Sequence, residues 1–331
     1  MAMIEQNISG VKLEKLRRKA EKKTKFLKRL PIGVFCVGVL LTLFVNRYFF
    51  ILIISGYEMS GDSILGGSFM IIGGIMMSLC VAAAALGIYL LAFWKKTYDI
   101  FNDNYKNKYV LLKMREVPGF SDLKYLPQKG ISFDELSKVS LLPGRTRAFF
   151  ESKDYFEGAY ETIRFRAGSV ETYESNNSSL SVFSGQVIVF SLFHEFKISE
   201  TVIQIFPRKE SKKMKGLTFP ERVETESEAF NDMFSVCAED GHNAFYILTP
   251  QVMEDIMEFG RIINNNVYLA FSGSDMYVGC EQMRNPFDAI VDMPIEEQSK
   301  NIVMATEIIQ KAREILIHIE NGNRKENEMR L

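Results

Sequence analysis

Two long apolar runs near the start of the chain, Leu30–Ile54 and Ser68–Trp94, constrain the fold more than any other feature. A helix needs about 20 mostly apolar residues to cross the hydrocarbon core of a bilayer, and both runs reach that length. The alternative, a very apolar core helix of a water-soluble protein, is disfavoured because the two runs are adjacent and basic residues flank them. The sequence therefore predicts an N-terminal two-helix transmembrane hairpin, with helices at about 30–54 and 68–94.

Basic residues give this hairpin an expected orientation. Residues 12–29 hold ten lysines and arginines, Lys95 and Lys96 follow the second run, and the loop between the runs has neither residue type. The positive-inside rule places basic flanks in the cytoplasm. We therefore expect a multi-pass protein of the cell membrane with two helices and both termini in the cytoplasm.

One arginine interrupts the first run. Arg47 follows Asn46 in the later part of that run, and an arginine at mid-bilayer costs about 3 kcal/mol on insertion scales. Its head could snorkel to the outer interface, or it could make a polar contact with the second helix or with a partner. The sequence leaves both roles open.

The segment before the hairpin, residues 1–29, is expected to contain a basic cytoplasmic helix. Leu13, Leu16 and Ala20 fall on one helical face, and lysines and arginines cover the rest. Such a helix is compatible with plain solvation and with attraction to anionic lipid headgroups, which contributes roughly 1 kcal/mol per basic residue near the surface. We expect the lipid bilayer and its anionic headgroups as partners, and a membrane protein as a possible further partner. The overall charge of −1 gives no reason to propose nucleic acid.

The segment after the hairpin, residues 95–149, is expected to begin as a juxtamembrane helix. Aromatic residues from Tyr98 to Tyr109 recur every three or four positions, which is the helical period. Pro118-Gly119 predicts the end of that helix, and a short helix is expected at 133–139. Residues 150–331 then form the predicted cytoplasmic α+β domain.

Patterns with a period of two predict a mixed, mainly antiparallel sheet in this domain. Strands are expected in β-branched and aromatic runs at residues 187–193, 201–206, 222–225, 267–271 and 276–280. The sequence also predicts a β-hairpin that turns at Ala167-Gly168 and a β-hairpin that joins strands at 234–237 and 244–248. The alternation of strands with helices makes the whole an α+β fold.

Local helix signals occur at two places in the second half of the domain. Thr225 with Glu228 three residues later fits a capping box. Thr249-Pro250 supplies a capping hydroxyl and a proline at the first helical position, and Gly260 is a natural stop. We therefore expect one helix to start at each of these signals.

The last predicted element is a long helix at about 294–320. Apolar residues, including Ile309 and Leu316, are spaced alternately three and four apart along it. A stripe of this kind is suited to packing on a sheet. A two-stranded coiled coil is the alternative.

Several short motifs gather in the second half of the chain. They are Glu226-Ser227-Glu228-Ala229-Phe230, Phe234-Ser235-Val236, Phe245-Tyr246-Ile247 and Leu248-Thr249-Pro250-Gln251-Val252-Met253, with Phe156-Glu157-Gly158, Phe183-Ser184-Gly185 and Asn285-Pro286-Phe287-Asp288 outside this group. Together they resemble the DUF3137 family of bacterial membrane proteins, over roughly residues 150–290 and the two-helix anchor. The family name marks an unknown function, so the resemblance implies topology and an envelope role, not a chemistry.

No catalytic, cofactor-binding or metal-binding residue is predicted. His194-Glu195 begins like the zinc motif HExxH, but Ile198 occupies the place of the second histidine. His242 fits a turn, and His318 fits the C-terminal end of a helix, where a partial negative charge favours it. The sequence has neither a phosphate-binding GxxxxGK[ST] loop nor a GxSxG elbow, and its four cysteines form no CxxC. The acidic cluster of Glu224, Glu226 and Glu228 is more typical of a solvated helix start than of a cation site.

These observations predict a membrane-anchored cytoplasmic binding or scaffolding module of the bacterial envelope, without catalysis. The alternative is a small-molecule sensor or an enzyme with an unrecognised site on the sheet domain. Fold alone does not decide between them.

Overall fold

The computed structural model describes residues 10–26, 29, 83, 86–144, 147–174, 177–191, 198–282 and 284–329. The chain divides into two compact units. The first, here the helical unit, comprises residues up to Asn104 together with Ile290–Ile295. The second, here the sheet unit, comprises Tyr105–Ala289 and Glu296–Leu331. Each is described by itself.

The helical unit contains helices over residues 10–26 and 86–104. Among the residues that the structure describes, no helix is both long enough and apolar enough to cross a membrane. The predicted transmembrane hairpin is therefore wrong as a fold assignment. Residues 30–82, with Arg47, lie outside the described residues. Of the second run, the described residues 83 and 86–94 are helical, and Lys95, Lys96, Asp99 and Asp103 follow in the same helix, whereas a membrane span needs about 20 mostly apolar residues.

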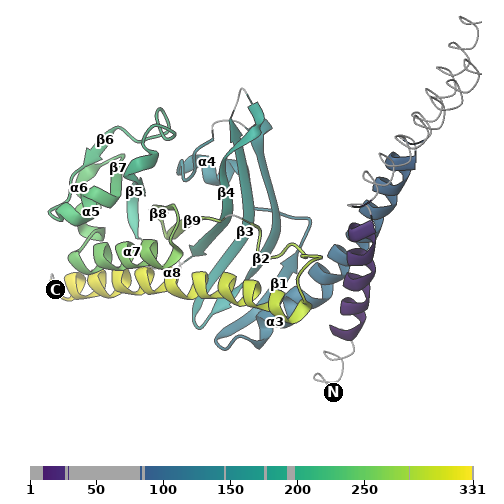
Figure 1. Ribbon diagram of the computed structural model, residues 1–331. Helices are drawn as coiled ribbons and strands as arrows, with labels where there is room; N and C mark the ends of the chain where they lie inside the picture. The colour runs from purple at the N-terminus through teal and green to yellow at the C-terminus, as the bar shows by residue number, and fades with distance from the viewer. Residues whose placement is uncertain are drawn as a thin grey trace, which may run out of the picture. The chain divides into compact units, whose positions relative to one another are not determined.

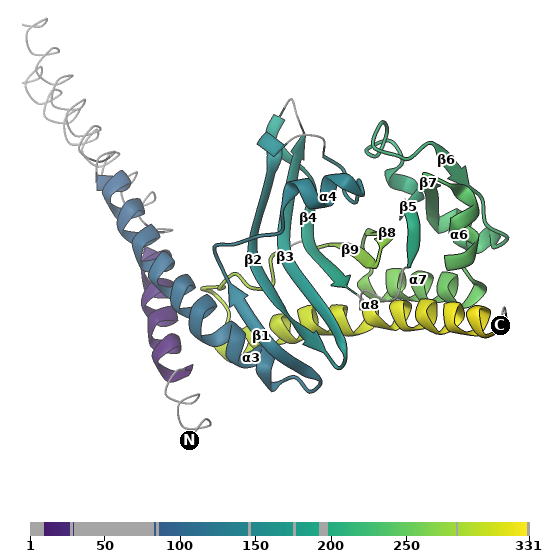
Figure 2. The same ribbon diagram turned by 180° about the vertical axis from the view of Figure 1, so that it is seen from behind.

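The sheet unit is built on one nine-stranded sheet, shown in Figures 1 and 2. The order is β1-β2-β3-β4-β9-β8-β5-β7-β6, and each neighbouring pair is antiparallel. The expected sheet is confirmed, although it is antiparallel throughout rather than mixed. Its strands are β1 (Phe120–Leu126), β2 (Phe150–Tyr160), β3 (Ile163–Glu174), β4 (Asn177–Ser191), β5 (Ser199–Pro207), β6 (Glu221–Val223), β7 (Phe234–Ala238), β8 (Val267–Gly273) and β9 (Asp275–Glu281).

Helices lie on both faces of this sheet. α8 is in front of the strands in Figure 1, whereas α4 is in front of them in Figure 2, which shows the opposite side. The elements are a π-helix η1 (Tyr105–Val110), α3 (Leu111–Glu116), α4 (Phe133–Lys138), the short 3-10 turns η2 (Arg147–Phe149) and η3 (Arg208–Glu210), α5 (Glu228–Met233), α6 (Gly241–Ile247), α7 (Pro250–Ile263) and α8 (Ile295–Met329). The sheet is thus the middle layer of the unit.

The two faces bury different side chains. On the α4 face, Leu136 and Val139 belong to one core cluster with Val170, Phe183 and Val187 of the strands. α8 buries the predicted apolar stripe, which consists of Ile302, Ala305, Ile309, Ala312 and Leu316, each at most 1 % exposed. Because this burial occurs within one chain, the stripe needs no second copy, as the coiled-coil alternative would.

Helix starts follow local hydrogen bonds. Thr249 caps α7 as predicted, since its hydroxyl accepts a bond from the Val252 N–H. Gly260 does not end α7, because the helix continues to Ile263. Asn264 caps it in the left-handed conformation and donates its N–H to the Gly260 carbonyl. The capping box at Thr225 is also wrong. Ser227 caps α5, and the Thr225 hydroxyl donates instead to Asn231 Oδ1.

Two predicted hairpins are also wrong. Ala167-Gly168 lies inside β3, and the chain turns earlier, at Glu161, whose φ is 51°. Residues 244–248 lie in and directly after α6 rather than in a strand. Asp240 starts that helix by accepting the His242 N–H, and a hydrophobic run of only five residues is too short for its period to exclude a helix.

Candidate functional site

The helical unit pairs its two helices through their polar side chains. Thr24 accepts a hydrogen bond of 2.7 Å from the Trp94 indole N–H. Lys23 donates to the Thr97 hydroxyl at 2.9 Å, and its ammonium lies 3.6 Å from the centre of the Phe93 ring. The basic helix 10–26, with eight basic and two acidic residues, therefore lies directly beside the apolar segment 86–94 of the second helix.

That apolar segment is largely exposed. Ile88 and Tyr89 are 69 % and 67 % exposed. Large apolar side chains are also exposed at Phe26, Leu86, Leu91, Phe93 and Ile100. Exposed apolar groups in such number, beside a strongly basic face, are typical of a helix that lies in the interface of an anionic bilayer. We call these two helices the basic–apolar surface.

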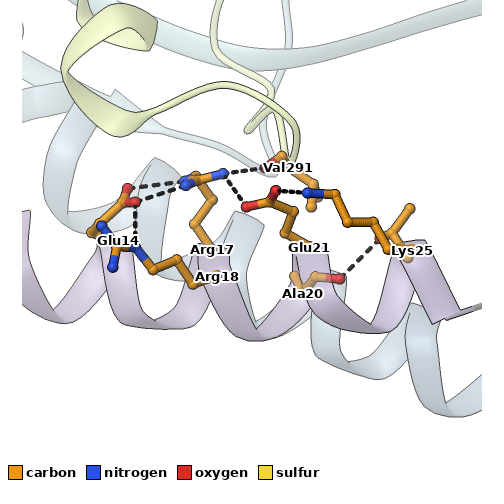
Figure 3. Close-up of polar contacts among 8 residues, drawn as sticks. Glu14, Arg17, Arg18, Ala20, Glu21, Lys25 and Val291 are labelled. Atoms are coloured by element: carbon orange, nitrogen blue, oxygen red, sulfur yellow. Dashed lines mark hydrogen bonds and ion pairs between the residues drawn. The ribbon is translucent and has the colours of Figure 1, made fainter.

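A buried arginine holds the third piece of the helical unit in place, as Figure 3 shows. Arg17, 7 % exposed, binds both carboxylate oxygens of Glu14, at 2.9 and 2.7 Å. It also donates to Glu21 at 2.9 Å and to the Val291 carbonyl at 2.7 Å. Since Val291 is distant in the sequence, Arg17 ties the segment Ile290–Ile295 to the basic helix.

The Arg17 contact gives a pH-dependent prediction. Its guanidinium lowers the pKa of Glu14 to about 2 from an ordinary 4.5, against the opposing effect of burial. A lowered carboxyl pKa stabilises the folded unit above pH 4.5, and this contribution is lost as the pH falls toward 2. In Arg17→Met, the Glu14 pKa measured by NMR titration should return toward 4.5. A Glu14 pKa that stays near 2 in this variant would assign the shift to another group.

The sheet unit contains a hollow of about 1010 Å³ along β1, β2 and β3, near α4, whose Glu135 pairs with Arg166 of the lining. It is lined by Arg115, Phe120, Ser121, Asp122, Leu123, Lys124, Glu157, Gly158, Ala159, Arg164, Phe165, Arg166 and Ser191. We call it the β1–β3 hollow. With four basic and two acidic side chains its lining carries a net charge of +2.

Strand register explains why there is room here. Arg164 of β3 lies between Ala159 of β2 and Ser191 of β4, and Ala159 in turn faces Ser121 of β1. Cross-strand partners share one face of a sheet. Two small side chains therefore flank Arg164, a third lies next to one of them, and the space that larger residues would fill stays open.

The next register row of the hollow is crossed by ion pairs. Lys124 of β1 lies 3.2 Å from Glu157 of β2, and Arg166 of β3 lies 2.9 Å from Glu135 of α4. The Tyr155 hydroxyl donates to Glu157 at 2.8 Å. This bond, followed by the one from Lys124, lowers the pKa of Glu157, whereas burial raises that of Glu135. Lys124 and Arg166 thus already have carboxylate partners.

Two arginines of the hollow lack such partners. Within the described part of the chain, neither Arg164 nor Arg115 forms an ion pair. Arg115 makes one long hydrogen bond, 3.5 Å, to the Leu123 carbonyl. Both residues are exposed. They are the two cations of the lining that have no carboxylate partner among the described residues.

A second charged cluster of the sheet unit is buried and fully engaged. Lys106 of η1, 5 % exposed, lies 2.8 Å from each carboxylate oxygen of Asp154, which is 0 % exposed, and 2.6 Å from Asp288. Tyr125 and Asn285 each donate to Asp154 at 2.6 Å. Burial, and then the charge of Asp154, raises the pKa of Tyr125, so the phenol remains a donor. This cluster stabilises the fold, and its buried Lys106 and Asp154 are not accessible to a ligand.

The motifs noted in the sequence have structural roles in this unit. Asn285 and Asp288 of the Asn-Pro-Phe-Asp motif belong to the buried lysine cluster, and Phe287 packs against Tyr125 and Phe156. Gly185 lies where a Cβ would come within 2.0 Å of the Cys280 carbonyl oxygen, and at Gly158 it would meet β1 at 2.8 Å. The glycines are therefore required for close packing of strands.

The histidines and the acidic cluster do not converge on one site. His242 contacts Tyr246 at 3.1 Å. His318 lies 2.5 Å from Asp255, well before the end of α8, so its expected place near a helix end is wrong. His194 lies outside the described residues. Glu224 pairs with Arg222, and the described residues contain no group of three or more potential metal-ligating His, Cys, Asp or Glu side chains.

Sequence reasoning missed the hollow. Arg164-Phe165-Arg166 does alternate with the period of a strand, which places both arginines on one face. That signal identifies a basic strand face, but the small neighbours Ala159 and Ser191 become relevant only through the register of three strands.

A comparison with known families finds a match to part of the chain. Residues 181–314 match the family described as "Protein of unknown function (DUF3137)". The match includes the motifs from Phe183 to Asp288 and supports the family that they predicted. No curated protein matches the chain at a significant level. Of the residues that line the β1–β3 hollow, only Ser191 falls within the matched span.

Proposed function

We propose that this protein is a non-catalytic binding module that attaches to an anionic lipid surface through its helical unit and binds a protein partner through its sheet unit. The observation that carries the proposal is the basic–apolar surface. It combines side chains that lose water favourably in the lipid interface with side chains that attract lipid phosphates.

The electrostatic part of this proposal rests on helix 10–26. Its eight basic and two acidic residues give a net charge of +6. Arg17 is buried and engaged with Glu14 and Glu21, but Lys12, Lys15, Lys19 and Lys22 are exposed. Anionic lipids are concentrated in the cytoplasmic leaflet, where the buried thiols of Cys237 and Cys280 would stay reduced. We therefore place the module at the inner face of a bacterial cell membrane.

The apolar part rests on residues 86–94 of the second helix. Ile88, Tyr89 and Leu91 are all more than half exposed. In water these side chains leave apolar surface uncovered, whereas the interface of a bilayer would cover it. Tyr89 and Trp94 also have the amphipathic rings that favour the headgroup level.

Vesicle co-sedimentation of the full chain tests the attachment. The chain should bind vesicles containing phosphatidylserine and should bind purely phosphatidylcholine vesicles far less. Replacing Lys15, Lys19 and Lys22 by glutamine should weaken binding to the anionic vesicles about 100-fold, at roughly 1 kcal/mol per basic residue. The same replacement of Lys209, Lys212 and Lys215, which are exposed in the sheet unit, is the matched control and should change binding little. Equal loss in both triple variants would mean that net charge, not this surface, drives attachment.

A second candidate function draws on the β1–β3 hollow. Its volume of about 1010 Å³ is at the upper end of the range for small-molecule sites, about 300–1,000 Å³. A sensor for a small anion would therefore use the same residues. The experiment of the next subsection distinguishes that ligand from a protein segment.

A further inference from the structure

We infer that the β1–β3 hollow binds an extended acidic peptide segment of a protein partner, with Arg164 and Arg115 as the contacts for its carboxylates. This inference rests on the proposed binding function and names the chemistry of the partner.

The first step is the accessibility of Arg164. Its cross-strand neighbours on the same face are Ala159 and Ser191, which are too short to reach or cover a guanidinium. Arg164 is exposed, and no described carboxylate forms an ion pair with it. A peptide carboxylate can therefore approach the planar edge of this guanidinium and accept two parallel hydrogen bonds.

The second step concerns the charges that surround Arg164. Glu157 is paired with Lys124, and Glu135 with Arg166, so these carboxylates are partly neutralised. Arg115, from α3, adds a second exposed guanidinium to the same lining. Two separated arginines favour a ligand with at least two carboxylates along its length.

The third step explains why a peptide suits this lining better than a polyphosphate chain does. The lining also contains the carboxylates of Asp122 and Glu157, and like charges brought together across an interface are unfavourable. A nucleic acid carries a negative charge on every phosphate, so it cannot keep its charges away from Asp122 and Glu157. A peptide can place neutral or basic residues opposite Asp122 and Glu157 and acidic residues opposite the arginines.

Fluorescence anisotropy with the full chain tests this inference. The probe is a labelled eight-residue peptide of alternating glutamate and alanine, whose acidic side chains share one face when extended. The comparison peptide has glutamine in place of glutamate. The acidic peptide should bind, and Arg164→Ala should weaken that binding about tenfold or more. Arg222→Ala removes the same charge from an exposed arginine on β6 and should leave the affinity nearly unchanged.

Other outcomes overturn the inference. Equal affinity for the two peptides, or equal loss in Arg164→Ala and Arg222→Ala, would show that Arg164 does not recognise carboxylates. If inorganic phosphate or free glutamate displaces the peptide at a concentration close to the Kd of the peptide, the hollow is a small-anion site instead. The vesicle assay separates the two proposals. If Arg164→Ala binds both the acidic peptide and the anionic vesicles as the wild type does, the inference about the hollow is wrong, and the proposed lipid attachment is unaffected.

Discussion

Lys106→Met should lower the free energy of unfolding of the sheet unit by about 3–5 kcal/mol, the usual cost of removing one partner of a buried ion pair. Asp154 is 0 % exposed and receives both of its short contacts with a cation from Lys106. The variant would leave this carboxylate buried, and its remaining side-chain donors among the described residues would be Tyr125 and Asn285. Two neutral donors do not replace the lost charge.

The measurement must follow the sheet rather than the helical unit. Trp94 is the single tryptophan of the chain and lies in the helical unit, so its fluorescence is not a reporter for Asp154. Urea unfolding should be followed by circular dichroism in the β-sheet band. Lys124→Met, which breaks the exposed pair with Glu157, is the control and should cost less than about 1 kcal/mol.

A double variant tests the reason for the loss. Lys106→Met combined with Asp154→Asn removes the buried negative charge together with its partner, so part of the lost stability should return. If the double variant is as unstable as the sum of the two single variants, the pair has no coupling. The cost of Lys106→Met would then come from packing of the lysine stem rather than from an unpaired carboxylate.

This cluster illustrates what the sequence could and could not provide. The Asn285-Pro286-Phe287-Asp288 motif was visible as a pattern, but its partners are distant: Lys106 is 48 residues and Asn285 131 residues from Asp154. Asp154 itself has a φ of 56°, a conformation that no local signal in a strand predicts. The residue types of the cluster can be taken from the sequence. That three distant segments come together around Asp154 follows only from the folded sheet.

Elements with a long or repeated signal were predicted best. Six apolar positions spaced alternately three and four apart predicted α8, and the Thr249-Pro250 pair predicted the start of α7. Short segments failed: residues 244–248 became α6 because the side chain of Asp240 accepts a backbone N–H at its start. Hydrophobicity alone failed too: the helix that contains residues 86–94 has four charges within its next nine residues, and no helix among the described residues is long and apolar enough to cross a membrane.

The candidate site was the part least accessible to sequence reasoning. The β1–β3 hollow depends on which residues are small beside Arg164, and those residues come from β2 and β4. A one-residue change in the pairing of either strand would move them to the other face. Such a site can be inferred only after register is known.

Leu316→Ala should lower the free energy of unfolding of the sheet unit by about 2–5 kcal/mol. Leu316 is 0 % exposed and lies on the same buried stripe of α8 as Ile309. Its truncation removes apolar contacts and leaves a cavity between the helix and its surroundings. This loss is a large share of the roughly 5–15 kcal/mol that stabilises a domain. Lys311→Ala, on the solvent side of α8 and paired with Glu314, should change stability by less than about 0.5 kcal/mol.

Denaturant unfolding at two protein concentrations decides whether this stripe serves its own chain. Burial of Leu316 within a single chain predicts a midpoint that is independent of concentration for the wild type and for Leu316→Ala, with the variant shifted to lower denaturant. A dimer seam would behave differently, because its stability depends on protomer concentration. A midpoint that rises with concentration, together with a smaller dimer fraction in Leu316→Ala, would mean that the stripe faces another copy and that its assignment to the core of the sheet unit is wrong.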